Sequence, residues 1–208
     1  ETSLIGLLQA LDPEQVEVDL FVHDHRGEMM PFIPQWVNLL PEIPEYAGIE
    51  RPMIEILKKG HIQLLLARLI ARWQFQRYVR KNHPKDGSSL FGYIGKYVTP
   101  ILPSLHRYGT YDLAISFLTP HNIVLEKVQA KKKICWIHTD YTNIDVNATL
   151  ELPVWAGYDY IASISEEAGK GFCQVFPSLQ SKLIEIENIL SPAFIRKRAQ
   201  EGGLPQDM

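Results

Sequence analysis

The chain has 208 residues, with 21 lysines and arginines against 24 aspartates and glutamates and a formal net charge of −3. Hydrophobic residues make up 46% of the chain and charged residues 22%, a balance typical of globular proteins, which excludes a disordered or fibrous chain. No apolar run approaches the roughly 18 residues that cross a bilayer. A mildly acidic chain without interleaved basic and aromatic residues is not expected to bind nucleic acid.

In the first half of the chain, helices are expected near the beginning and the end, and a proline-rich segment lies between them. Leucines and isoleucines at helical spacing predict an amphipathic helix over 2–11, which Asp12 and Pro13 end. The other elements expected before residue 110 are a strand at 16–22, a short strand at 36–40, a helical stretch at 52–81 interrupted at Gly60, and a helix at 89–105. The segment 31–52 holds too many prolines for long elements.

The second half alternates short apolar strands with helices. Ser163 with Glu166 three residues later forms a capping box, which predicts the start of a helix. The expected strands lie at 111–118, 134–138, 158–163 and 183–187, and the other expected helices at 120–130 and 192–200. This alternation indicates a parallel sheet covered on both faces. We therefore expect an α/β fold with a doubly wound, Rossmann-like parallel sheet in a single domain over residues 1–208.

The two cysteines, Cys135 and Cys173, each sit in an apolar run. Two buried thiols in a chain of this length do not make a disulfide framework, so a reducing compartment is favoured. Nothing at the N-terminus resembles a signal peptide. We expect a cytoplasmic location.

Polar residues follow each expected strand of the sheet. In doubly wound sheets, ligands bind outside the carboxyl ends of the strands, so these residues are the candidate site. The residues that we select from them are Thr119, His138, Thr139, Asp140, Ser163, Ser165, Glu166 and Asn188. The run from His138 to Asp140 is the most suggestive, because an apolar strand ends there and places a histidine and an aspartate at the carboxyl edge of the sheet. The alternative there is an Asx turn beside a structural histidine.

Several familiar motifs are absent. His23, Asp24 and His25 include two metal-ligating histidines, but adjacent residues on an extended segment point to opposite sides and no third ligand lies nearby. The sequence has no Asp-x-Asp pair that would hold a magnesium nucleotide, no phosphate-binding P-loop and no nucleophile elbow. We therefore expect no metal site and no cofactor.

The segment 58–85 is strongly basic. It holds eight lysines and arginines, no aspartate or glutamate, and several leucines and aromatic residues. A basic amphipathic helix of this kind can lie on an anionic membrane surface, which would place the protein peripherally on the inner face of the membrane. The other interpretation is a helix whose apolar face packs on the sheet and whose charges are solvated.

Three segments of the second half carry a resemblance to a known family. YDLAISFL (111–118), KKKICWIHTDY (131–141) and YDYIASISEE (158–167) resemble the N-terminal domain of family 4 glycosyltransferases, which are two-domain GT-B enzymes that build bacterial glycans. The similarity extends through KLIEIEN (182–188) and the opening helix, and it is weakest over 31–110.

Two features of the family pattern lie outside this sequence. In the family, an apolar strand and a glycine-rich turn precede the helix that begins here at Glu1, so we expect roughly 15–25 further residues before it. Glu1 would be the acidic residue just after that turn. The family's nucleotide-binding second domain, with its paired glutamates, has no counterpart in the 208 residues.

The resemblance implies retaining transfer of a sugar from a nucleotide-sugar donor to a glycan or lipid-linked acceptor, without an obligatory metal. By the family pattern His138 would hydrogen-bond the transferred sugar, and Asp140 would line the same cleft. The donor- and acceptor-binding residues would be Glu1, Thr119, Thr139, Ser163, Ser165, Glu166 and Asn188. The nucleotide would be held mainly by the second domain, so the 208 residues alone are expected to be inactive.

Two other classes of function remain open at this stage. One is a flavodoxin-like or response-regulator-like binding module, although a response regulator needs a cluster of acidic residues that the sequence does not show. The other is a structural domain that uses the cleft for protein contact.

Overall fold

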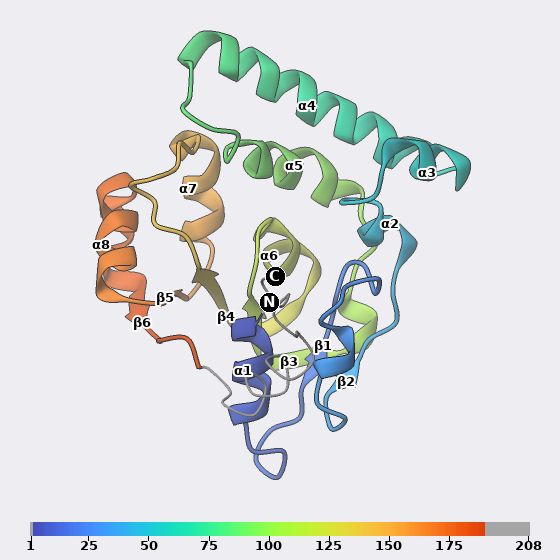
Figure 1. Cartoon of the computed structure of the whole chain (residues 1–208), viewed down its shortest axis with the longest axis vertical. Helices are drawn as coiled ribbons and strands as arrows, with labels where there is room; N and C mark the ends of the chain where they lie inside the picture. Colours follow the sequence, from blue (N-terminus) through green and yellow to red (C-terminus); the bar gives the residue numbers. More distant parts are fainter. Residues whose placement is uncertain (1, 190–208) are drawn as a thin grey trace, which may run out of the picture. The chain divides into compact units, whose positions relative to one another are not determined.

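The computed structural model describes residues 2–189, which belong to two compact units (Figure 1). Among the described residues, the first unit comprises residues 2–43 together with Asn188 and Ile189, and the second comprises Pro44–Glu187. Among the described residues, no helix is long and apolar enough to cross a membrane. The helix expected at 192–200 lies outside the described residues.

The first unit contains one helix and a small parallel sheet. The expected opening helix is confirmed as α1 (Thr2–Ala10), which buries Ile5 and Leu8. The other elements are β1 (Asp19–Leu20), the 3-10 helix η1 (Met30–Phe32) and β2 (Asn38–Leu39). The strand expected over 16–22 is thus limited to two residues, because its partner β2 is itself confined by Pro34 and Pro41.

Helices form the first part of the second unit. They are α2 (Pro44–Ala47), α3 (Met53–Lys58), α4 (Ile62–Asn82), α5 (Leu90–Val98), η2 (Thr99–Ile101) and η3 (His106–Tyr108). The interruption predicted at Gly60 is confirmed: this residue has φ of +76° and separates α3 from α4. The helix expected over 89–105 ends earlier, at Val98, because Pro100 cannot continue an α-helix.

The second unit is built on a four-stranded parallel sheet with the strand order β3-β4-β5-β6. The strands are β3 (Thr110–Ser116), β4 (Gln129–Ile137), β5 (Tyr160–Ser163) and β6 (Leu183–Glu185). The connecting helices are α6 (Asn122–Lys127), α7 (Ala148–Ala156), α8 (Glu166–Val175) and η4 (Pro177–Lys182). The chain is therefore α/β with a parallel sheet, as predicted. Within the described part of this unit, the strand order follows the sequence.

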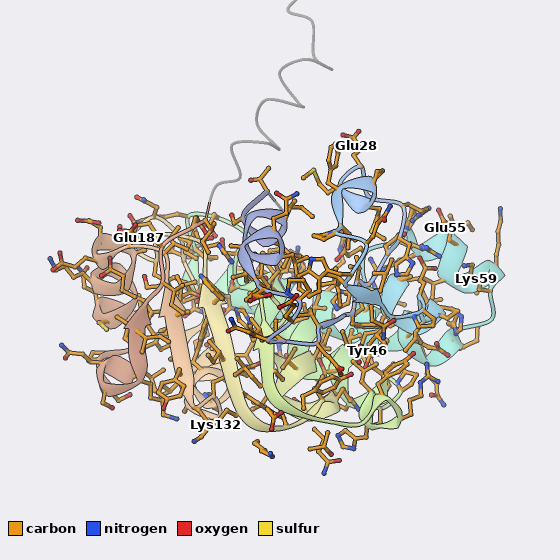
Figure 2. All side chains as sticks on the ribbon, turned by 90° about the horizontal axis from the view of Figure 1, so that it is seen from below. Glu28, Tyr46, Glu55, Lys59, Lys132 and Glu187 are labelled. Carbon is orange, nitrogen blue, oxygen red and sulfur yellow. The ribbon has the colours of Figure 1, made fainter. Side chains whose placement is uncertain are left out.

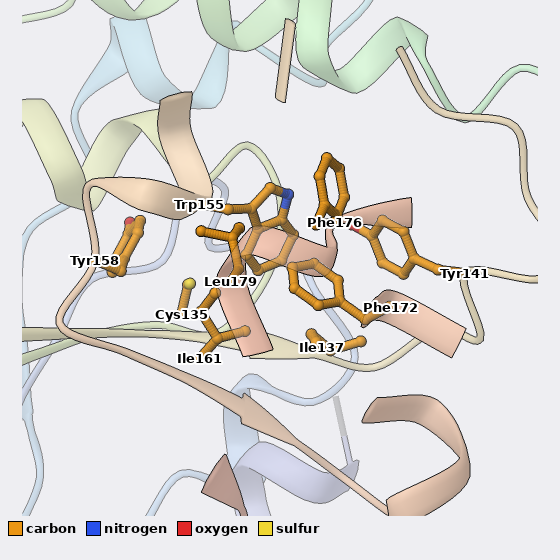
Figure 3. Close-up of a cluster of buried hydrophobic side chains, with 9 residues drawn as sticks. All are labelled: Cys135, Ile137, Tyr141, Trp155, Tyr158, Ile161, Phe172, Phe176 and Leu179. Atoms are coloured by element: carbon orange, nitrogen blue, oxygen red, sulfur yellow. The ribbon is translucent and has the colours of Figure 1, made fainter. Parts of the chain in front are cut away.

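One face of the sheet carries the aromatic core of the unit (Figure 3). Cys135, Ile137 and Ile161 point from β4 and β5 toward side chains of α7 and α8. Trp155 and Phe172 meet there edge to face, with ring centroids 4.9 Å apart. Neither cysteine forms a disulfide, and burial raises the pKa of the Cys135 thiol. This packing fixes the positions of β4 and α7, which carry the site.

Three boundaries in the sheet region differ from the prediction. The helix expected to reach Ala130 ends at Lys127, and β4 already begins at Gln129, so the lysine run lies in a strand. There Lys131 and Lys132 pair with Asp112 and Asp159, with both Nζ–Oδ1 distances below 2.8 Å (Lys132 is labelled in Figure 2).

The other two differences concern helix starts. Helix α7 was not expected because Pro153 lies inside it. Helix α8 is capped by Ser165, whose hydroxyl accepts a hydrogen bond from the Ala168 amide, and not by Ser163, which is the last residue of β5. The predicted capping box is therefore wrong.

Helices α5 and α4 form further layers beyond the sheet. Helix α5 packs on α6 and α7, and α4 packs in turn on α5 (Figure 1). Within the second unit, α4 is therefore an outer helix, with one face against α5 and the opposite face directed away from it.

Candidate functional site

A cavity of about 510 Å³ lies at the carboxyl ends of β3 and β4, within the second unit. Residues of helices α5, α6 and α7 complete its wall. Its aromatic lining comes from Phe91, Phe117, Trp136, Tyr141 and Trp155, and its polar lining includes Thr119, His121, His138, Thr139 and Glu151. The place and the volume are typical of ligand sites in parallel α/β sheets.

His138 follows the last residue of β4 and lies beside two aromatic rings. The centroid of its imidazole lies 4.3 Å from that of the Phe117 ring and 6.1 Å from that of the Trp136 ring. The imidazole and the Trp136 ring are nearly parallel, with an interplanar angle of 8°. Burial lowers the pKa of His138, while a hydrogen bond to the Phe117 backbone opposes this shift. The imidazole is therefore neutral at pH 7.

The hydrogen bonding of His138 selects its tautomer. Nε2 is buried and has no hydrogen-bond partner among the described residues, so the contact with the Phe117 backbone falls to Nδ1. A neutral ring that donates from Nδ1 leaves Nε2 as an acceptor. The neighbouring Trp136 Nε1, a donor, is likewise buried without a partner among residues 2–189. Each of these nitrogens can be satisfied by a hydroxyl group of a ligand, because a hydroxyl can donate to Nε2 or accept from Nε1.

A second histidine, His121, supports the wall of the cavity. Its Nδ1 lies 2.8 Å from Ser116 Oγ, its carbonyl accepts a hydrogen bond from the Tyr158 hydroxyl, and its ring centroid is 4.5 Å from that of Trp155. Burial, with a smaller contribution from the charge of His138, lowers the pKa of His121 to about 3. His121 therefore stays neutral and fixes the segment that carries Thr119.

Glu151 on α7 is the main polar group of the cavity that the sequence did not reveal. It accepts a hydrogen bond from Trp155 Nε1 at 3.3 Å and another from the Tyr141 hydroxyl. Burial raises the pKa of Glu151 to about 7, and these two hydrogen bonds only partly oppose the shift. A carboxyl group with this pKa exchanges protons readily at neutral pH. The sequence feature that could have indicated Glu151 is Asn147. Its side chain accepts a hydrogen bond from the Leu150 amide and so caps α7, which places Glu151 in the first turn of that helix.

Of the predicted residues, the structure brings Thr119, His138 and Thr139 together at the cavity. Asp140 does not line it. Its carboxylate accepts hydrogen bonds from the Thr142 amide and hydroxyl, which lower the pKa of Asp140, and from Asn143 Nδ2. This is the Asx-type turn that was left open as the alternative for Asp140.

The remaining predicted residues lie elsewhere. Ser163 is buried at the end of β5 and donates a hydrogen bond to the Ser165 carbonyl at 2.8 Å, while Ser165 caps α8. Glu166 pairs with Lys170 on the surface of α8. Asn188 is exposed and belongs to the first unit, and Glu1 lies outside the described residues. The cavity thus gathers the residues after β3 and β4, but not those after β5 and β6.

Residues 2–189 contain no group of three or more histidine, cysteine, aspartate or glutamate side chains that could hold a metal ion. The cavity instead combines aromatic rings, hydroxyls, two neutral histidines and the carboxyl group of Glu151, together with the exposed side chains of Lys96 and Glu126. Such a lining suits an uncharged ligand with several hydroxyl groups.

No protein-family model matches the chain, and no curated protein sequence matches it.

Proposed function

We propose that this chain is the acceptor-side half of a retaining, GT-B-type glycosyltransferase and that the cavity at the ends of β3 and β4 binds a sugar. Three segments that resemble family 4 glycosyltransferases support the proposal. Two of them, 111–118 and 131–141, contain most of β3, much of β4 and the loops that enter the cavity. The proposal also fits a parallel α/β sheet whose ligand site lies beyond the carboxyl ends of its strands.

The observation that carries the proposal is the pair of buried ring nitrogens without partners, His138 Nε2 and Trp136 Nε1. Buried polar atoms are rarely left unpaired, so the two nitrogens indicate a ligand that offers a donor to His138 Nε2 and an acceptor to Trp136 Nε1. The hydroxyl groups of a sugar supply both donors and acceptors, and the apolar face of a sugar ring packs well against an aromatic ring such as Phe117. A phosphodiester is a poorer fit, because it has no hydrogen to donate to Nε2.

The chemistry would divide between His138 and Glu151. In glycosyl transfer, the bond between the anomeric carbon and the leaving diphosphate breaks, positive charge develops on the sugar, and the acceptor oxygen forms the new bond. An Nε2 lone pair that accepts from a sugar hydroxyl binds more strongly as that charge develops. Glu151, about half ionised near pH 7, is the group available to take the proton of the acceptor hydroxyl.

The first experiment measures binding to this chain. We expect titration calorimetry to detect short oligosaccharides, to detect nucleotide sugars weakly or not at all, and to lose the oligosaccharide signal in His138→Ala. Asp140→Asn is the matched control, because Asp140 serves a turn outside the cavity. Equal affinity of wild type and His138→Ala for every sugar would overturn the proposal.

The second experiment measures catalysis in the intact enzyme. We expect His138→Ala to lower kcat/KM by about 10²-fold, equivalent to roughly 3 kcal/mol of transition-state stabilisation, with little change in thermal stability. The 208-residue chain alone should transfer no sugar. Preserved specific activity with a melting temperature several degrees lower would instead assign His138 a structural role.

A further inference from the structure

The outer helix α4 carries apolar side chains on two opposite faces. On one face, Leu64, Ala67 and Ala71 are buried, and the rings of Phe75 and Tyr78 contact Tyr93 of α5. On the other face, Ile62, Leu66, Leu69 and Trp73 follow the i, i+4, i+7, i+11 spacing of a single helical stripe. These four side chains are between 46% and 56% exposed. The exposed stripe is not required for packing within the unit.

Exposed apolar residues are concentrated in this part of the chain. Of the sixteen large apolar side chains that are exposed among residues 2–189, seven lie between Ile54 and Trp73. The two that precede α4, Ile54 and Leu57, belong to α3, which packs on α4. A contiguous exposed apolar surface of this kind marks an interaction site more often than a solvated face.

Basic side chains accompany the stripe. The segment 58–85 has a net charge of +8 and no acidic residue. Arg72, Arg77, Arg80 and Lys81 are exposed along α4, and Lys58 and Lys59 are exposed before it; Lys59 extends away from the body of the chain (Figure 2). The Arg77 guanidinium lies 5.0 Å from the Trp73 ring centroid, a cation–π contact at the junction of the apolar and basic parts.

The basic end of α4 also borders a shallow depression. Arg77, Arg80 and Lys81 line it together with Tyr78 and Tyr93. Positive charge, hydrogen-bond donors and aromatic edges in an open hollow suit an anionic headgroup rather than a buried apolar ligand.

We propose that the outer face of α4 lies on an anionic lipid bilayer, with Ile62, Leu66, Leu69 and Trp73 in the interfacial region and the basic side chains against headgroups. Helices that bind in this way combine leucine and tryptophan with lysine and arginine and need not span the membrane. The proposal does not depend on the sugar-binding function of the cavity.

Charge favours the bilayer over the other possible occupants. A second copy of the chain that docked through the same face would bring two segments of net charge +8 together without an acidic side chain from either segment. Like charges at a dry contact oppose association. A bilayer with anionic lipids supplies both an apolar layer and a negative surface, which matches the two parts of α4.

The test is cosedimentation of the full chain with vesicles of phosphatidylcholine alone or with 30% phosphatidylglycerol, about 100 nm in diameter. We expect at least ten-fold stronger partitioning onto the anionic vesicles, falling steeply between 50 mM and 500 mM salt. Leu66→Gln with Trp73→Gln, and separately Arg77→Gln with Arg80→Gln and Lys81→Gln, should each lower this partitioning at least ten-fold. The matched controls, Leu152→Gln on α7 and Arg107→Gln with Lys131→Gln and Lys170→Gln, should bind like wild type.

Two further measurements keep the test decisive. Circular dichroism should show unchanged helix content in every variant, because the substituted side chains are exposed. Brominated lipids should quench tryptophan fluorescence in wild type but much less in Trp73→Phe. The proposal is overturned by absent vesicle binding, by equal binding of both vesicle types, or by a salt-independent dimer that Trp73→Gln dissociates, which would identify a second copy as the partner.

Discussion

The cavity at the ends of β3 and β4 and the outer face of α4 use similar side chains in opposite ways. In the cavity, aromatic rings enclose a few polar groups, and a tryptophan such as Trp155 is only 2% exposed. On α4, apolar side chains are exposed to solvent, and Trp73, which contacts Arg77, is 56% exposed. The cavity has neutral histidines and one carboxyl group near half ionisation, whereas α4 has only positive charge.

The difference shows how unsatisfied groups point to a partner. The cavity leaves two hydrogen-bonding nitrogens unpaired among the described residues, which calls for a ligand with polar atoms. Helix α4 leaves apolar area uncovered, which calls for a surface with an apolar layer. Substitutions that remove the same side chain in both regions should therefore have opposite consequences for stability and for binding.

The largest contrast is expected from the two tryptophans. Trp155→Ala should lower the free energy of unfolding by about 3–5 kcal/mol, because it leaves a cavity among Phe172, Tyr141 and His121. Trp73→Ala should change it by no more than about 0.5 kcal/mol, since an exposed side chain leaves no cavity. Urea unfolding of both variants measures the difference. A cost above about 2 kcal/mol for Trp73→Ala would mean that the outer face of α4 is packed in solution.

The next effect concerns the buried carboxyl group. The pKa of Glu151 is raised from 4.5 to about 7 in the folded chain, so between these pH values the folded state retains a proton that the unfolded state releases. Stability should therefore fall as pH rises from about 4.5 to 7, by up to roughly 3 kcal/mol, and then level off. Glu151→Gln should remove this fall, so the variant should gain stability relative to wild type as pH rises to 8.

Urea unfolding at pH 5, 6, 7 and 8 tests this slope. Glu126→Gln on α6 is the matched control, because it removes one negative charge from an exposed side chain at the same cavity. The control should follow the wild-type profile. A Glu151→Gln profile parallel to wild type would contradict the burial of an ionisable carboxyl group in the cavity.

Most of the sheet region could be predicted from sequence because its strands are apolar and short. The segments that became β3, β4, β5 and β6 were each recognised, with errors only at their ends. Those errors have local causes. The start of β4 was missed because a run of lysines is typical of a loop, and the ion pairs of Lys131 and Lys132 with Asp112 and Asp159 cannot be seen in the sequence. Helix α7 was missed because Pro153 masks a helical pattern that Asn147 starts.

The site was predicted only in part, for a geometric reason. His138, Thr119 and Thr139 follow strands, so the general rule for parallel sheets finds them. Glu151 reaches the cavity from a helix, and its burial depends on contacts that no local pattern encodes. Conversely, Ser165 and Asp140 have the residue types of a binding site but satisfy the backbone of a cap and a turn.

The smallest of the three effects tests α5, which lies between the cavity and α4. A Cβ at Gly95 would clash with the side chain of Asn122 at the start of α6 and approach Pro120 Cβ at 3.3 Å. Gly95→Ala gains about 1 kcal/mol of helix propensity but must displace α5 from α6, so we expect a net loss of about 1–2 kcal/mol. Gly87→Ala, where a Cβ meets nothing within 4 Å, should stay within about 0.5 kcal/mol of wild type.

The same substitution should separate the two kinds of binding. Because Asn122 lines the cavity and the outer face of α4 is unchanged, Gly95→Ala should weaken oligosaccharide binding and leave vesicle binding unchanged. Loss of both activities together would show that the two regions depend on one another through α5.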